Sequence, residues 1–332
     1  MDNPAIDEKF SISYETLWKA IIRPPRDDYT EEDLIEPVFT YRGKTYLRKD
    51  YDLLSSQGYI LKCSFIEPDD ESRPTAEMPV VIYLHGNSSS RLEGLRMLHL
   101  LIKLDINLFV FDFAGSGLSG GEYISLGYHE QNDVRIIVDF VEKLPGVGKI
   151  GLWGRSMGAA TTMLYAHTDE RVEAIVMDSP FTDFKRLAKE MCQSMVKIPG
   201  FLVDVALGVV GRTVKNKNGM DVNKLRPIDA AELTTTPAIF IHAMTDELIP
   251  FQHSLDLCEK YAGEKSLKSC DGGHNSKRPR EILDAVGQFF CEHLKQGYKD
   301  TTNEIIPVEE KKEKKESEGN LIEERSSEDD TD

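Results

Sequence analysis

The five residues Gly154-Arg155-Ser156-Met157-Gly158 have the types and spacing of a nucleophile elbow, G-x-S-x-G. In that motif a serine stands on a sharp turn between a strand and a helix, which leaves its hydroxyl open to a substrate. Residues 149–153 are mostly apolar, as in a buried strand, and residues 159–166 have the composition of a helix packed on a sheet. The glycines suit a turn where two backbones approach too closely for Cβ atoms. A tight turn whose serine only caps the helix is the alternative interpretation.

A serine hydroxyl needs a base that accepts its proton, and the base needs an acid that orients it. Where this elbow occurs, the acid and then the base follow the serine along the chain. His274, in a glycine-rich loop after the last predicted strand, is the candidate base. Asp246, shortly after a predicted strand at 238–242, is the candidate acid. Glu247 and Asp178 are the alternatives for the acid, although we interpret Asp178 as a turn or capping residue.

Catalysis by such a serine also needs hydrogen-bond donors for the developing oxyanion. The loop His85-Gly86-Asn87-Ser88 follows a predicted strand at 80–84, where esterases of this type carry one donor. The backbone N–H groups of Asn87 or Ser88, and of Met157 after the serine, are the candidate donors. The glycine-rich residues 112–119 resemble a dinucleotide-binding loop, but no predicted helix follows them, and we interpret them as a structural turn.

Strands and helices alternate from residue 79 onward, which predicts an α/β fold with a mostly parallel central sheet and helices on both faces. The predicted helices include 14–22, 92–104, 129–144, 251–261 and 280–295, and a hairpin is expected from strands at 44–54 and 59–66. The alternation breaks at about 181–236, where apolar clusters lack a clean strand. We expect a short helical insertion there, either a cap over the substrate pocket or an ordinary connection; the two interpretations are favoured equally.

Composition and charge divide the chain into three parts. Residues 1–36 are expected to form an N-terminal extension, 37–298 the α/β domain, and 299–332 a disordered charged tail with 13 acidic and 6 basic residues. The whole chain has a formal net charge of −17, which argues against binding to nucleic acid. A tail of this kind can bind proteins, but we favour a solvating role.

The cysteines indicate a reducing compartment. The chain has five of them, widely spaced and without a C-x-x-C pair, so we expect neither a disulfide framework nor a zinc site.

The N-terminus is polar and no run approaches the roughly 18 apolar residues of a membrane span, so we expect no transmembrane segment and a cytoplasmic protein. The expected chemistry requires no metal and no organic cofactor.

The ordered motifs resemble those of the α/β-hydrolase fold family over about residues 40–297. More narrowly, residues 121–127 and 177–181 resemble a eukaryotic subgroup of serine-aminopeptidase-like hydrolases, and the chain is also similar to hydrolases that remove palmitate from protein cysteines. The resemblance implies Ser156 as the nucleophile, Asp246 as the acid and His274 as the base.

These residues together predict a serine hydrolase that cleaves an ester, thioester or amide bond of a small-molecule or acylated substrate through an acyl-enzyme intermediate. A carboxylesterase or acyl-thioesterase is the preferred form. A serine peptidase of the aminopeptidase type and a catalytically silent, protein-binding member of the fold are the alternatives.

Overall fold

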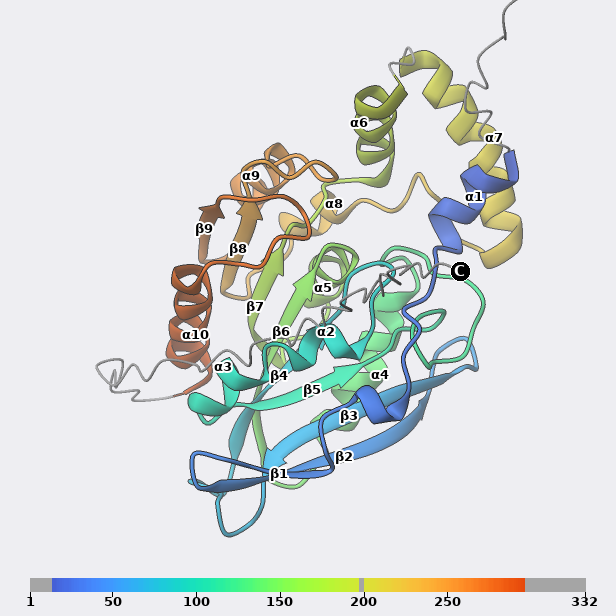
Figure 1. Ribbon diagram of the computed structural model, residues 1–332. Coiled ribbons are helices and arrows are strands. Elements are labelled where there is room, and N and C mark those ends of the chain that lie inside the picture. Colours follow the sequence, from blue (N-terminus) through green and yellow to red (C-terminus); the bar gives the residue numbers. More distant parts are fainter. Residues whose placement is uncertain (1–13, 197–199, 296–332) are drawn as a thin grey trace, which may run out of the picture. The chain divides into compact units, whose positions relative to one another are not determined.

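The computed structural model describes residues 14–196 and 200–295, so the predicted tail and the first residues of the N-terminal extension lie outside the described residues. A nine-stranded sheet runs through the described part in the order β1-β2-β3-β5-β4-β6-β7-β8-β9 (Figure 1). The strands are β1 Val38–Tyr41, β2 Lys44–Leu54, β3 Ile60–Pro68, β4 Met78–Leu84, β5 Asn107–Phe111, β6 Val147–Arg155, β7 Val172–Asp178, β8 Ala238–Ala243 and β9 Lys265–Cys270. Strands β4 to β9 pair in parallel and β1, β2 and β3 join antiparallel, which confirms the predicted mostly parallel α/β fold.

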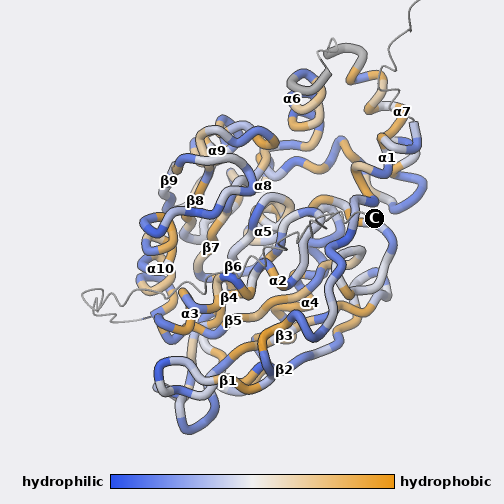
Figure 2. The backbone as a smooth tube through the Cα atoms, in the orientation of Figure 1, coloured by the Kyte–Doolittle hydropathy of each residue, from blue (hydrophilic) through white to orange (hydrophobic). Residues whose placement is uncertain are grey.

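Helices cover both faces of the sheet because successive strand residues point to opposite sides. In β4, Val80 and Ile82 pack in one core with α4, α5, α8 and α9, whereas Val81 and Tyr83 pack in another with α3 and α10. Strand β5 is buried along its whole length, and its apolar character is visible in Figure 2. The helices are α1 Tyr14–Ile22, α2 Arg91–Leu95, α3 Leu98–Lys103, α4 Glu130–Val141, α5 Met157–Ala166, α6 Phe184–Val196, α7 Gly200–Asn218, α8 Pro227–Ala231, α9 Gln252–Lys260 and α10 Arg280–Leu294, with a 3-10 turn at Glu31–Asp33.

One local prediction was wrong, and one strand was not predicted. The single helix expected at 92–104 is two short helices, α2 and α3. Gly94 lets α2 approach the sheet, since a Cβ there would lie 2.5 Å from Val110, but glycine also weakens a helix. Strand β1 was not predicted; it forms a hairpin with β2 through a turn in which Arg42 and Gly43 both have positive φ.

The stretch at 181–236 contains helices α6, α7 and α8, which pack in two different apolar clusters. Helix α7 packs against α6 and against α1, whose Trp18 is buried under the Lys217 ammonium at 4.3 Å. The N-terminal helix α1 therefore extends the apolar cluster of α6 and α7, which also includes Ala160 of α5. Helix α8 instead packs on α5 in the main core through residues such as Ile228.

One buried carboxyl group leads to a stability prediction. Asp133 of α4 is 2% exposed, and burial together with nearby Glu130 raises its pKa to about 7. An unfolded aspartate has a pKa of about 3.9. The folded chain therefore binds more protons than the unfolded chain between these values, and this group's contribution to stability falls as the pH rises through that window.

Replacing Asp133 by asparagine removes this titration and keeps an oxygen that can accept from Ser56. The quantity to compare is the free energy of unfolding of Asp133→Asn minus that of the wild type. We expect this difference to be about 2–3 kcal/mol more favourable to the variant at pH 8 than at pH 5. Urea unfolding at the two pH values measures this difference. An equal effect at both would show that Asp133 does not titrate in this window.

Candidate functional site

Ser156 stands at the junction of β6 and α5 in a strained backbone conformation, with φ 53° and ψ −113°. The flanking glycines make this turn possible. A Cβ on Gly158 would lie 1.9 Å from the carbonyl oxygen of Leu84, and one on Gly154 would lie 2.2 Å from the carbonyl oxygen of Gly158. No larger residue fits at either position without a shift of the backbone. Close packing therefore explains why both positions are glycine.

The structure brings Ser156, His274 and Asp246 into one chain of hydrogen-bond contacts. His274 Nε2 lies 3.0 Å from Ser156 Oγ, and His274 Nδ1 lies 2.7 Å from Asp246 Oδ2. The loop after β9 carries the histidine and the loop after β8 carries the aspartate, so both come from the carboxyl ends of neighbouring strands. The arrangement lets an imidazole accept the serine proton while a carboxylate holds its other nitrogen.

Asp246 is fully buried, and it is held as a carboxylate. Burial alone would raise its pKa, but hydrogen bonds from His242 and His274 and from the backbone N–H of Ile249 hold the pKa well below its usual range. His242 lies with Nε2 3.3 Å from Asp246 Oδ2 and 2.8 Å from the carbonyl oxygen of Ile249, while its Nδ1 contacts Ser254 Oγ. The sequence analysis did not predict this contact between His242 and the acid.

The other two candidates for the acid, Glu247 and Asp178, form their hydrogen bonds with groups other than the His274 ring. Glu247 accepts the backbone N–H of His274 at 3.1 Å, not a ring nitrogen. The carboxylate of Asp178 forms a buried pair with Arg278 at 2.7 Å, and its carbonyl oxygen accepts the backbone N–H of Ser156 at 2.8 Å. Asp178 thus supports the elbow from the end of β7.

The loop with Asn87 and Ser88 lies beside the serine. A Cβ on Gly86 would be 3.7 Å from the Cβ of Ser156. His85 is fully buried: Nδ1 contacts the carbonyl oxygen of Gly86 at 2.7 Å, and Nε2 accepts the backbone N–H of Phe113 at 3.1 Å. This pattern fixes the proton on Nδ1 and makes His85 a loop-shaping residue. The backbone N–H of Met157 begins α5, where such groups have no partner within the helix.

A charged clamp, formed by Glu93 and Arg155, joins the two loops around the serine. Glu93 accepts the backbone N–H of Gly86 at 2.9 Å and pairs with Arg155 at 2.7 Å. Arg155 also donates to the carbonyl oxygen of His274 at 2.9 Å and to Asn275 at 2.8 Å. Burial alone would raise the pKa of Glu93, but Arg155 and the Gly86 N–H hold it below its usual range.

Removing one member of the clamp is expected to leave a buried charge without its partner. We expect Arg155→Met to lower the free energy of unfolding by about 3 kcal/mol, measured by urea denaturation. The double variant Glu93→Gln/Arg155→Met is expected to recover part of this loss because the uncompensated carboxylate is gone. A double variant no more stable than the single one would contradict the clamp.

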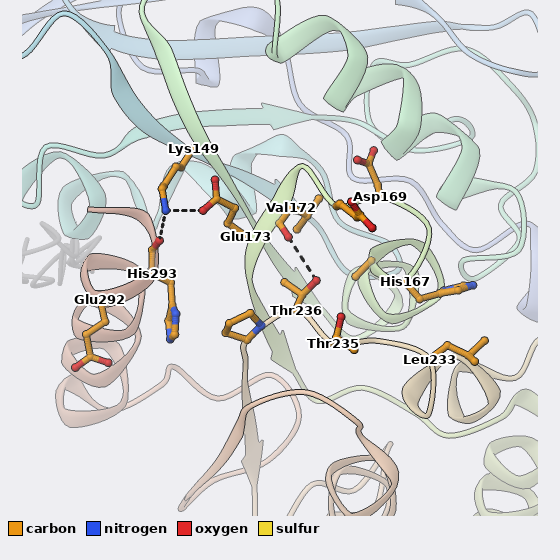
Figure 3. A pocket seen from close by; sticks show the side chains of 13 residues that line it. Lys149, His167, Asp169, Val172, Glu173, Leu233, Thr235, Thr236, Glu292 and His293 are labelled. Atoms are coloured by element: carbon orange, nitrogen blue, oxygen red, sulfur yellow. Dashed lines mark hydrogen bonds and ion pairs between the residues drawn. The ribbon is translucent and has the colours of Figure 1, made fainter. Parts of the chain in front are cut away.

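Figure 3 shows the residues that line a cavity of about 650 Å³. This cavity lies at the opposite end of β6 from the serine. Its lining includes Lys149 near the start of β6, seven residues before Ser156, or about 20 Å along a strand. Lys149 pairs there with Glu173 at 2.5 Å and donates to the carbonyl oxygen of His293 at 3.2 Å. This cavity is therefore separate from the candidate site.

Two kinds of feature are absent from the described residues. Within 14–196 and 200–295, no group of three or more His, Cys, Asp or Glu side chains has a metal-binding arrangement. No described helix has the length and apolar character needed to cross a membrane.

The chain is similar to known hydrolases in sequence and in fold. Residues 76–221 match the sequence profile of the serine aminopeptidase S33 family. The chain is 28% identical over 225 residues to the uncharacterised protein YqkD of Bacillus subtilis, covering 67% of this chain and 71% of that protein. It is 27% identical over 197 residues to the lysophosphatidylserine lipase ABHD12 of Danio rerio, covering 57% of this chain and about half (49%) of that relative.

Solved structures share the fold. The esterase Pf2001 of Pyrococcus furiosus superposes with a TM-score of 0.62 at 22% identity, over 82% of this chain and 98% of that one. The alpha/beta hydrolase GrgF of Penicillium sp. sh18 superposes with a TM-score of 0.57 at 18% identity, over 74% and 99%. The order of strands and helices around the serine is thus one that hydrolases use.

Proposed function

We propose that this chain, whose fold is that of the α/β hydrolases, is a serine hydrolase acting through Ser156, His274 and Asp246. The observation that carries the proposal is the unbroken contact chain from Ser156 Oγ to Asp246 Oδ2, with distances of 3.0 and 2.7 Å, at the end of a strained elbow. A serine that only capped α5 would need neither neighbour, and its side chain makes no capping hydrogen bond.

The proposed mechanism follows from the proton positions. Ser156 Oγ attacks the carbonyl carbon of the substrate while its proton passes to His274 Nε2. The resulting oxyanion accepts from the backbone N–H of Met157 and from that of Asn87 or Ser88. His274 then gives the proton to the leaving group as the acyl bond breaks. Water, activated by His274, hydrolyses the acyl-serine and restores the free hydroxyl.

An acyl ester or thioester is the substrate class that we propose. The apolar cluster of α1, α6 and α7 includes Ala160 at the start of α5 and Ile249 in the loop of the acid, so apolar side chains adjoin both sides of the site. A fatty or aromatic acyl group would find matching surroundings there. The lipase and esterase names of the relatives point to the same bond.

A comparison of esters with amides tests this substrate class. We expect p-nitrophenyl acyl esters of two to twelve carbons, and acyl thioesters of the same chains, to be hydrolysed at least about 100-fold faster than aminoacyl p-nitroanilides. The S33 profile match favours the second candidate, an aminopeptidase-type enzyme, and faster cleavage of the anilides would establish it instead. Absence of turnover on all three classes would favour the silent protein-binding alternative.

A further inference from the structure

A second cavity, of about 710 Å³, lies next to the loop that follows His274. Its lining combines the ends of β6 and β7 with α2 and the loop at 275–278, and the described residues of that lining include neither Ser156 nor His274. We propose that this cavity binds a small organic anion, a carboxylate- or phosphate-type group attached to an apolar body. The proposal goes beyond the hydrolase activity and does not depend on it.

Positive charge exceeds negative charge in the lining. The charged lining residues are four cations and two acids: Arg96, Arg155, Lys277, Arg278, Glu93 and Asp178. Both acids are already paired inside the protein, Glu93 with Arg155 and Asp178 with Arg278, each at 2.7 Å. Arg96 and Lys277 are exposed and have no ion-pair partner among the described residues. Two uncompensated cations thus face one cavity in a chain whose formal net charge is −17.

The same lining has an apolar part. Trp153 is 2% exposed and protein atoms cover its indole Nε1, so the indole contributes its ring and no donor to the lining. Met97 and Leu283 are half-buried and also line the cavity. They give the apolar body of the ligand a surface to contact.

The two tryptophans of the chain give a direct readout, because Trp18→Phe leaves Trp153 as the only indole. The full-length Trp18→Phe protein would be titrated with phenylphosphonate, which carries an anion on an aromatic ring and has no ester to cleave. We expect a saturable change in Trp153 fluorescence. Arg96→Gln and Lys277→Gln, added separately, are each expected to raise the Kd about threefold or more. Benzyl alcohol, which has the ring without the charge, is expected to give no saturable change.

The matched control is Lys185→Gln, which removes an exposed cation from α6, outside the cavity. It is expected to leave the Kd unchanged, and equal melting temperatures would show that the variants fold alike. Parallel titrations with benzoate and inorganic phosphate distinguish a carboxylate ligand from a phosphate one. No saturable signal with any of the three anions would overturn the proposal, as would equal weakening by Lys185→Gln. Because no turnover is measured, this result is independent of the hydrolase proposal.

Discussion

Replacing Ser156 by alanine is expected to lower kcat/KM for the best acyl ester by about 10⁴- to 10⁶-fold. The loss is this large because the serine oxygen forms the bond to the acyl carbon, and no neighbouring group can take its place. Initial rates with the wild-type chain and the Ser156→Ala variant, on the same ester, measure it.

The fold of this variant is expected to survive. Ser156 has φ 53°, a value that alanine adopts no more easily than serine, so the strain of the elbow is similar in both proteins. We expect a melting temperature within a few degrees of the wild type. A variant that is folded and retains full turnover would show that the nucleophile lies elsewhere.

Asp246→Asn is expected to lower kcat by about 10³- to 10⁴-fold. The carboxylate now accepts from His274 Nδ1 at 2.7 Å, which leaves Nε2 free to accept the serine proton. An asparagine amide can donate to Nδ1 instead, and the proton of the imidazole then moves to Nε2, where it faces Ser156. Steady-state kinetics at neutral pH would measure the loss, since the low pKa of Asp246 keeps it ionised there.

The neighbouring Glu247→Gln is the matched control. Among the described residues, Glu247 accepts a hydrogen bond from the backbone N–H of His274, at 3.1 Å, and glutamine keeps an oxygen for that contact. We expect a loss of at most about tenfold. If Glu247→Gln were as damaging as Asp246→Asn, the acid would be Glu247, the alternative that the sequence left open.

Much of the fold could be predicted from local sequence patterns alone. The predicted strand at 44–54 coincides with β2, and the predicted helix at 14–22 coincides with α1. Strand β1 was missed because its four residues lie at the sheet edge and are partly exposed, which weakens the hydrophobic pattern. The break between α2 and α3 was missed because the reason for Gly94, its contact with Val110, is visible only in three dimensions.

The site likewise contains residues that the sequence predicted and residues that it did not. Chain order and loop position singled out Ser156, Asp246 and His274, and the structure places them in contact, although their catalytic roles stay predictions. The clamp of Glu93 and Arg155 joins residues 62 positions apart, and no local pattern indicates such a pair. His242 carried one weak signal, its spacing of four residues from Asp246.

Labelling with a fluorophosphonate probe tests the central claim most directly, because the probe bonds only to an activated serine. The wild-type chain, Ser156→Ala and His274→Ala would be compared at equal concentration, with melting curves to show that each is folded. We expect the wild type to label at Ser156 and both variants to lose the label. Labelling that persists in Ser156→Ala, or a folded wild-type chain that does not label, would contradict the account.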